Sequence, residues 1–297
     1  DVLTQTKTLH PPRLALATAQ NRLAEKGLFD ELAIPVAPYR AVDSLQSLKQ
    51  AVAELGLPIV LKTVTGGYDG KGQFVLRSED QIDTAWAELG PAKSLIAESF
   101  VKFSREVSII AVRGQDGDVK TWALAENHHH NGILSHSIVP APNSTDLQPV
   151  AQDYITRLLN HLNYVGVLTL ELFVTEQGLY ANEMACRVHN SGHWSIEGAI
   201  CSQFENHIRA VAGLPLGATD VVRPTVMVNI IGQHPKSEDV LALKGAHLHL
   251  YNKSERAGRK LGHITLMPNN SDELTDLCRQ LAQILPVPLA LTTDMNI

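Results

Sequence analysis

Two glutamates in a predicted hairpin have the type and spacing that could hold a divalent cation. The segments 165–174 and 179–184 flank a short loop, in which Gly178 suits a left-handed position. We therefore expect a hairpin with a three-residue loop that ends at Gly178. This register places Glu171 opposite Glu183, with Cβ atoms about 5 Å apart on the same face.

Two like charges at this separation require something that neutralises them. A raised pKa, a basic neighbour or a cation would do so. Mg²⁺ fits because it typically binds one or two carboxylates together with substrate phosphates, and Asn182 offers one more oxygen. Two solvated surface glutamates are the alternative, and a bulge near the loop would shift the register.

A second candidate is a glycine-dense loop between the predicted strands 58–62 and 74–77. Its glycines are Gly66, Gly67, Gly70 and Gly72. Such a loop lets backbone N–H groups approach phosphate oxygens, and Lys62 at the strand end supplies a point charge. It is not a Walker A loop, because Gly72 follows Lys71 where Ser or Thr is needed, and the dinucleotide spacing also fails. An ordinary flexible hairpin loop remains the alternative.

The elements that position these residues follow from periodicity and from Gly and Pro breaks. Helices are expected over 18–32, 44–55, 80–89, 147–162, 203–212 and 272–285, and further strands over 94–100, 106–113 and 121–126. Strands and helices do not alternate regularly, so the pattern favours an α+β fold over a doubly wound sheet. The Gly- and Pro-containing stretch 213–224 indicates a domain boundary.

Composition narrows the function classes. The chain has 297 residues, about two domains by length, and a net charge of −6, which argues against a general nucleic-acid-binding surface. The sequence has neither a membrane-length apolar run nor a signal peptide at its start. Cys186, Cys201 and Cys278 form no CxxC pair and indicate reduced thiols in a cytoplasmic protein.

Taken in order, these pieces resemble the ATP-grasp superfamily. Within it, the chain is similar to the N5-carboxyaminoimidazole ribonucleotide synthetase family. The motifs TGGYDGKGQ (65–73), RVHNSGHW (187–194) and AGRKLGH (257–263) carry the resemblance, which runs from about Ala19 to the C-terminal region.

The resemblance implies an α+β ATP-grasp fold with a smaller, mostly β C-terminal domain. The ATP-grasp domain is expected at 19–215 and the C-terminal domain at 222–297. Residues 1–18 would be a remnant or linker of a Rossmann-like N-terminal domain that is largely absent, so the chain starting at Asp1 could bind ATP yet carboxylate poorly.

The implied reaction is the carboxylation of 5-aminoimidazole ribonucleotide by ATP and bicarbonate through carboxyphosphate, with release of ADP and phosphate, in purine biosynthesis. The implied cofactors are ATP and two Mg²⁺ ions, with bicarbonate as co-substrate. The family also implies a cytoplasmic homodimer that binds neither nucleic acid nor membrane.

The resemblance also assigns roles residue by residue. Glu171 and Glu183 would hold the metal, and Arg187, Asp69 and Lys260 would be catalytic. The ATP site would comprise Arg22, Lys62, Gly67, Tyr68, Asp69, Gly70, Lys71, Gly72, Gln73, Glu98, Ser99, Phe100, Val101, Glu106, His129, Asn182 and Glu183. The aminoimidazole nucleotide would meet Tyr68, Asp69, Lys71, Arg187, His189, Asn190, Ser191, Arg259 and Lys260.

Other interpretations stay open at this point. Another ATP-grasp enzyme, such as a biotin carboxylase or a formate-dependent glycinamide ribonucleotide transformylase, would share the ATP half but lack the pairing of RVHNSGHW with AGRKLGH. A nucleotide-binding module without turnover is a different class, against which the intact Lys62, Glu171, Glu183 and Arg187 argue. Cys186 is interpreted as a packing residue, and the histidines at 128–130 are not expected to bind zinc.

Overall fold

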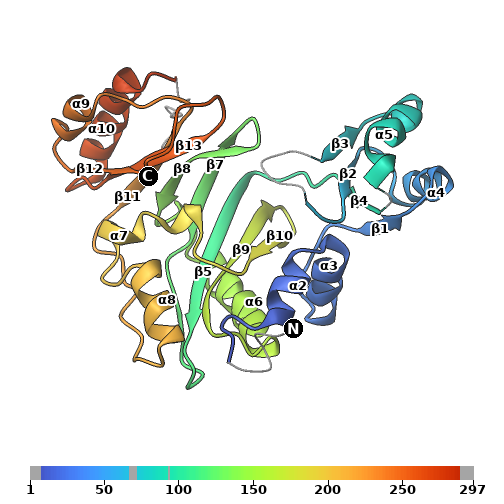
Figure 1. Ribbon diagram of the computed structural model, residues 1–297, viewed down its shortest axis with the longest axis horizontal. Coiled ribbons are helices and arrows are strands. Elements are labelled where there is room, and N and C mark those ends of the chain that lie inside the picture. The colour runs from blue at the N-terminus through green and yellow to red at the C-terminus, as the bar shows by residue number, and fades with distance from the viewer. Residues whose placement is uncertain (1–7, 67–71, 93, 288–297) are drawn as a thin grey trace.

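The structure is a computed structural model that describes residues 8–66, 72–92 and 94–287. Figure 1 shows two sheets that lie apart in the molecule: a small one with its own helices, and a large one at the centre. The small sheet has the strand order β1-β4-β2-β3, and the large one has the order β10-β9-β5-β7-β8-β11-β13-β12, with β6 beside β5. Paired strands are antiparallel, which agrees with the predicted α+β class.

The small lobe contains one continuous stretch of chain. Its elements are β1 (Tyr39–Val42), α4 (Leu45–Leu55), β2 (Ile59–Thr63), β3 (Gln73–Leu76), α5 (Ile82–Leu89) and β4 (Leu95–Ser99). Helix α4 begins where predicted, because Ser44 and Ser47 form a capping box that satisfies its first N–H groups. Its apolar face then packs on Ile59 and Leu61 of β2.

The large sheet spans the rest of the chain. Its strands are β5 (Arg105–Arg113), β6 (Val119–Thr121), β7 (Ala125–His130), β8 (Ile133–Val139), β9 (Gly166–Thr175), β10 (Gly178–Ala185), β11 (Thr225–Ile231), β12 (Ala246–Leu250) and β13 (Lys260–Leu266). The helices around it are α2 (Arg13–Ala19), α3 (Arg22–Glu31), α6 (Leu147–His161), α7 (Ser195–Gly198), α8 (Gln203–Val211), α9 (Ser237–Leu241) and α10 (Ser271–Ile284).

The single helix predicted over 18–32 is wrong. The chain forms α2 and α3 instead, with a break at Asn21, whose backbone is extended and whose side chain accepts hydrogen bonds from Leu23 N and Ala24 N. An asparagine that satisfies two N–H groups in this way begins a helix and does not continue one.

The single strand predicted over 121–126 is also wrong. The chain forms β6 and β7, and β7 continues through the three histidines before returning as β8. Asn131 and Gly132 make the turn with positive φ angles of 51° and 75°. An Asn-Gly pair is a strong hairpin signal, so this strand pair was readable from the sequence.

The segment after 213–224 extends the large sheet and builds no separate one. Strand β11 pairs with β8, and β13 and β12 follow outward. Helices α9 and α10 cover this end, with Val240, Leu274 and Leu281 buried against the strands. The C-terminal residues are therefore positioned by the same sheet that carries Glu171.

Candidate active site

The β9–β10 hairpin turns one residue more tightly than predicted. Thr175 pairs with Gly178, so the loop has two residues, and Leu179 pairs with Val174 instead of Thr175. Gly178 adopts φ 116°, in the region that favours glycine. The three-residue loop expected from the sequence is thus wrong.

Glu171 nevertheless lies opposite Glu183. The ladder shifts by one residue between Ala181 and Glu183, which leaves Asn182 as the extra residue of a β-bulge. The tighter turn and the bulge offset each other. The predicted pairing of the two glutamates is confirmed, although the loop is shorter than predicted and a bulge restores the register.

Positive charges surround this pair. Although Glu183 opens to solvent, loss of hydration in the crowded site and the charge of Glu171 raise its pKa, while Arg22 and Lys62 act in the opposite direction. Burial opposes ionisation of Glu171, but a hydrogen bond from His189 and the charge of Lys260 hold its pKa below the usual range. The tertiary structure thus brings basic side chains from four separate segments to the two carboxylates.

His189 connects Glu171 to the interior. Its Nε2 lies 3.1 Å from Glu171 Oε1, and its Nδ1 lies 2.8 Å from Ser191 Oγ. Its backbone N–H donates to Gln203, whose amide donates back to the carbonyl of His189. The imidazole is therefore fixed at both nitrogens.

The hydrogen-bond chain continues beneath the sheet surface. Ser191 Oγ lies 2.8 Å from Ser108 Oγ, which accepts from Asn127 Nδ2 at 2.9 Å. Ser137 donates to Asn127 Oδ1 at 2.8 Å. These four side chains are buried, so the loop of the RVHNSGHW motif is tied to β5, β7 and β8 by a polar network with satisfied partners.

Lys62 is held by an ion pair in the small lobe. Its Nζ lies 3.2 Å from Glu98 Oε2, and Lys26 Nζ approaches the same oxygen at 3.5 Å. Arg22 donates to the carbonyl of Thr63, directly after Lys62. Both expected phosphate-side cations therefore lie at the junction of α3 and β2.

The expected nucleotide segment leaves the small sheet at β4. Ser99 N donates to the carbonyl of Pro38, and Phe100 N donates to the carbonyl of Pro58. Phe100 is exposed and lies under the guanidinium of Arg77. Val101, half-buried, continues toward the large sheet.

Glu106 and His129 come together as expected. Glu106 of β5 pairs with Asn127 of β7, and His129 Nδ1 lies 3.3 Å from Glu106 Oε2. Burial lowers the pKa of His129, yet the Glu106 carboxylate outweighs this and raises it above its usual value.

The residues expected around the aminoimidazole nucleotide are only partly assembled. The Asn190 and Asn229 amides bond each other in both directions, at 2.9 and 2.7 Å, which ties the motif loop to β11. Arg187 is exposed and bonds the carbonyl of Val188. The positive charge of Lys260 is close enough to lower the pKa of Glu171, whereas Arg259 donates hydrogen bonds to Ser254 within its own turn.

Part of the predicted site lies outside the described residues. This applies to Gly67, Tyr68, Asp69, Gly70 and Lys71 of the glycine loop. At the end of the loop, the carbonyl of Gly72 accepts from Thr63 N, and Gln73 pairs with Lys62 in the β2–β3 ladder.

Comparisons with known proteins agree with this geometry. An ATP-grasp domain model matches residues 27–204, and a phosphoribosylaminoimidazole carboxylase C-terminal domain model matches residues 225–276. The N5-carboxyaminoimidazole ribonucleotide synthase of Vibrio cholerae is 45% identical over 291 residues, covering 96% of this chain and 77% of that protein. The chain belongs to the N5-carboxyaminoimidazole ribonucleotide synthase family.

Solved structures of this family share the fold. The Thermus thermophilus synthetase has a TM-score of 0.92 at 46% identity, over 96% of this chain and 78% of that one. The Aspergillus clavatus synthase, in complex with ADP and 5-aminoimidazole ribonucleotide, has a TM-score of 0.87 at 30% identity, over 96% and 78%. The chain thus spans about three quarters of these relatives.

The donor set of this family member fits Mg²⁺. Two opposed carboxylates offer only oxygen ligands and leave room for phosphate oxygens and water. Among the residues that the structure describes, His, Cys, Asp and Glu form no group of three or more suited to a metal ion.

Cys186 has the character of a packing residue. Burial and the nearby Glu25 raise the pKa of its thiol to about 12, and its Sγ donates to the carbonyl of Ala15. A thiol so far from ionisation is not a nucleophile at neutral pH.

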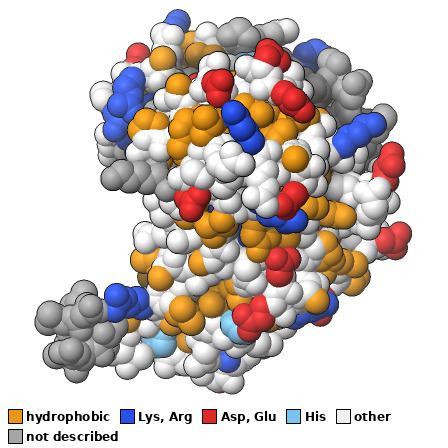
Figure 2. All heavy atoms as spheres, turned by 90° about the vertical axis from the view of Figure 1, so that its right-hand side faces the viewer, with side chains coloured by type: hydrophobic (Ala, Val, Ile, Leu, Met, Phe, Trp, Pro, Cys, Tyr) orange, Lys and Arg blue, Asp and Glu red, His pale blue; other side chains and the backbone are white. Residues whose placement is uncertain are grey.

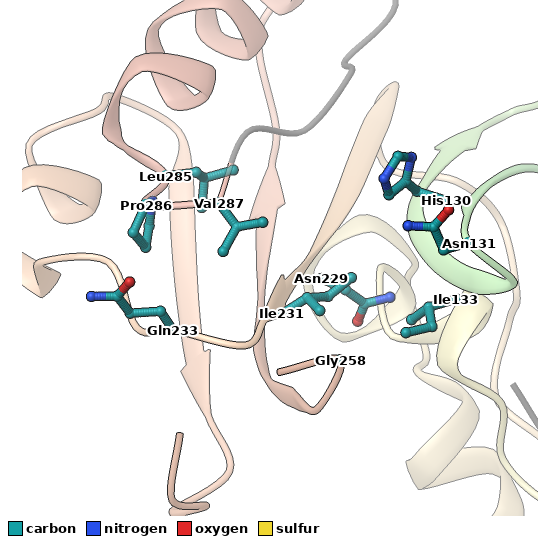
Figure 3. Close-up of a pocket in the computed structure, with 10 residues that line it drawn as sticks. All are labelled: His130, Asn131, Ile133, Asn229, Ile231, Gln233, Gly258, Leu285, Pro286 and Val287. Carbon is teal, nitrogen blue, oxygen red and sulfur yellow. The ribbon is translucent and has the colours of Figure 1, made fainter. Parts of the chain in front are cut away.

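A cavity of about 230 Å³ lies between the β7–β8 turn and the C-terminal segment, and its lining includes Asn229, the partner of Asn190 (Figure 3). It is lined by His130, Asn131, Ile133, Asn229, Ile231, Gln233, Gly258, Leu285, Pro286 and Val287. None of these residues was expected in the site, and the lining has no carboxylate and neither Lys nor Arg. We therefore place the chemistry at the β9–β10 hairpin.

Several residues that shape the site were missed from the sequence. Ser108 lies in a strand where a polar side chain among apolar neighbours was a usable signal, as does Asn229 in TVMVNII. Asn127 lies between Glu126 and His128 and gave no such signal. Glu25 and Lys26 gave no such signal, because charged residues in a helix are normally solvated.

Proposed function

We propose that this chain carboxylates the exocyclic amine of 5-aminoimidazole ribonucleotide with ATP and bicarbonate, and releases ADP and phosphate. The opposition of Glu171 and Glu183, surrounded by Arg22, Lys62 and Lys260, carries the proposal. Family membership supports it, since relatives at 44–49% identity are N5-carboxyaminoimidazole ribonucleotide synthases.

The reaction has two half-reactions, and different residues of the chain act in each. In the first, a bicarbonate oxygen attacks the γ-phosphorus of ATP, which gives carboxyphosphate and ADP. Lys62 and Arg22 offset the phosphate charge, and phosphoryl transfer depends mainly on such positioning and charge stabilisation. Mg²⁺ held by Glu171 and Glu183 would neutralise the negative charge that develops on the β- and γ-phosphates.

In the second half-reaction, the amine nitrogen forms a bond to the carboxyl carbon, the bond from that carbon to the phosphate oxygen breaks, and the amine loses one proton to the departing phosphate. Arg187, at the edge of the motif loop, is the candidate to orient the carboxyl group, and Lys260 is placed to balance its charge. Asp69, outside the described residues, is the candidate to accept a hydrogen bond from the amine and orient it. Glu106 and His129 would bind the ribose of ATP.

A coupled ADP-release assay with each substrate omitted in turn tests this reaction. ADP formation should require both bicarbonate and 5-aminoimidazole ribonucleotide. Stimulation by biotin or by formate would instead assign the chain to another ATP-grasp reaction. ADP binding without any turnover would make it a nucleotide-binding module.

The number of metal ions and the cellular location are part of the same proposal. We place two Mg²⁺ ions at the Glu171–Glu183 pair with ATP bound. A cytoplasmic location is supported by the three free cysteines. No helix of the described residues has the length and apolarity to cross a bilayer.

A homodimer is also part of this proposal. Four apolar side chains of this region are exposed: Ile196 in α7, Ile200 between the two helices, and Phe204 and Ile208 in α8. Exposed apolar side chains gathered in one segment fit burial against a second copy. Light scattering on the purified protein checks the dimer.

On the face that Figure 2 shows, acidic and basic side chains are interspersed, which offers no basic stripe for nucleic acid.

A further inference from the structure

The bulge at Asn182 leaves backbone groups that the ladder cannot pair. Strand β10 is at the end of the nine-stranded sheet, so only β9 borders it there among the described strands. Ala181 N donates to the carbonyl of Pro35. The carbonyls of Ala181 and Asn182 and the N–H of Met184 lie on either side of Glu183 and need partners of their own.

Lys26 supplies the donor for both carbonyls. Its Nζ lies 2.8 Å from Asn182 O and 3.4 Å from Ala181 O, and only 2% of its side chain is exposed. The same Nζ is 3.5 Å from Glu98 Oε2, the oxygen that also binds Lys62. One ammonium group therefore contacts both the metal-side backbone and the carboxylate that holds the phosphate-side lysine.

Glu25 supplies the acceptor on the other side. Its Oε1 accepts a hydrogen bond from Met184 N at 2.7 Å, and the residue is 2% exposed. Glu25 and Lys26 are neighbours in the first turns of α3, which Asn21 caps and which Leu28 and Phe29 anchor in the core. The helix thus presents two adjacent side chains to the peptide groups that flank Glu183.

Burying two ionisable groups is costly, and an apolar pair of similar volume often packs as well or better. Packing alone therefore does not explain a glutamate and a lysine at these positions. Their hydrogen bonds to the bulged backbone do, because those backbone groups would otherwise be left without partners beside the site.

We propose that Glu25 and Lys26 are positioning residues. Their hydrogen bonds hold the backbone on both sides of Glu183 and so fix its carboxylate opposite Glu171. Through Glu98, Lys26 also sets the place of Lys62 relative to that pair. This inference rests on the proposed role of Glu171 and Glu183 in binding Mg²⁺.

The test compares variants that keep or remove these hydrogen bonds. Lys26→Met and Glu25→Leu remove them at similar volume, whereas Glu25→Gln keeps an acceptor oxygen. Asn206→Leu is the matched control: Asn206 is fully buried in α8, and its amide bonds the backbone of Gly217, far along the chain from the hairpin. Mn²⁺ binding to the protein–ADP complex is followed by electron paramagnetic resonance, together with the Mg²⁺ dependence of ADP release and the melting temperature without ligands.

Loss of residues that orient metal ligands typically weakens metal binding about 10- to 100-fold. We expect Lys26→Met and Glu25→Leu to weaken Mn²⁺ binding, and to raise the half-saturating Mg²⁺ concentration, by at least about tenfold. Glu25→Gln should stay near the wild type. Asn206→Leu should lower the melting temperature and leave the Mg²⁺ dependence unchanged.

Wild-type Mg²⁺ dependence in both Lys26→Met and Glu25→Leu would overturn the inference, even if both melt earlier. If Lys26→Met does not fold, Glu25→Leu and Glu25→Gln decide alone, and equal Mn²⁺ affinity in the two overturns it. If the wild-type complex with ADP binds no Mn²⁺, the proposed metal site itself fails, which is a different outcome from loss in the variants only.

Discussion

Glu171 of β9 faces Glu183 of β10 only because the chain inserts Asn182 as a bulge between Ala181 and Glu183. The two-residue turn at Gly178 alone would place Asn182 opposite Glu171. Glu183 would then point to the other face of the sheet, since a shift of one residue reverses every side chain. The bulge restores the pair, and α3 holds the bulge.

The pair leads to a first prediction for Glu183→Gln. The variant keeps the shape of the side chain but loses its charge, so Mg²⁺-dependent ADP release should fall by at least about a hundredfold. The melting temperature should be equal or higher, because the repulsion from Glu171 that raises the pKa of Glu183 disappears. Glu176→Gln, in the exposed turn of the same hairpin, is the control and should keep its activity. Undiminished turnover in Glu183→Gln would contradict the proposed metal site at this pair.

A second prediction concerns Ser108, which lies between Ser191 and Asn127 in the buried network. Ser108→Ala leaves Asn127 Nδ2 without this acceptor and removes one of the two hydrogen bonds of Ser191 Oγ, so it should lower the free energy of unfolding by about 1–3 kcal/mol. It should also lower kcat, because His189 loses the support that reaches it through Ser191.

Ser44→Ala is the matched control for this change. It removes the cap of α4 at a cost of about 1 kcal/mol and lies outside the polar network. Denaturant unfolding and steady-state kinetics are measured for both variants. An equal kcat in the two would contradict the positioning role of Ser108.

Asn229 gives a third prediction, which separates the two substrates. Asn229→Ala removes the partner of Asn190 and releases the motif loop from β11. The KM for 5-aminoimidazole ribonucleotide should rise several-fold, while the KM for ATP should not change, because Lys62 and Arg22 lie at the junction of α3 and β2 and not on β11. Titration of each substrate at saturation of the other measures this. Equal increases in both KM values would show that the pair does not act on one substrate.

The fourth prediction is a pH dependence of stability at His136. Burial, with the nearby His128, lowers its pKa to about 3, so the folded state keeps this imidazole neutral while the unfolded state protonates near pH 6.5. Its contribution to stability is therefore present above pH 6.5 and is lost as the pH falls from 6.5 toward 3. The slope reaches about 1.4 kcal/mol per pH unit for one proton.

His136→Phe keeps a ring in the stack with His128 and cannot bind this proton. Urea unfolding of the variant between pH 8 and 5 should show a shallower loss of stability than the wild type below pH 6.5. Parallel curves for the two proteins would mean that His136 is protonated equally in the folded and unfolded states.

Many of the candidate site residues could be identified from the order of residues in the sequence. Strands flanking a glycine-rich loop after Lys62, the acidic hairpin and the RVHNSGHW motif each carry their signal within about ten residues. Local patterns of this kind determine turns, caps and amphipathic faces. Helix α4 formed where predicted for the same reason, with Ser44 as its cap.

Predicted elements were wrong where a local sequence signal was missed or was compatible with two structures. The break between α2 and α3 depends on Asn21 capping a new helix, and the strands β7 and β8 depend on the turn at Asn131. The hairpin loop was assigned one residue too many at Gly178, because a glycine with positive φ suits several turn types.

The sequence by itself determined which residues we propose for the chemistry: Glu171, Glu183, Lys62 and the loop that begins at Arg187. The tertiary structure alone decided how they meet. The bulge at Asn182 is stable because Lys26 and Glu25, more than 150 residues earlier, satisfy its backbone groups. Hydrogen bonds between such distant segments leave no periodic trace in the sequence, since each side chain there has many possible partners until the sheet and α3 are packed together.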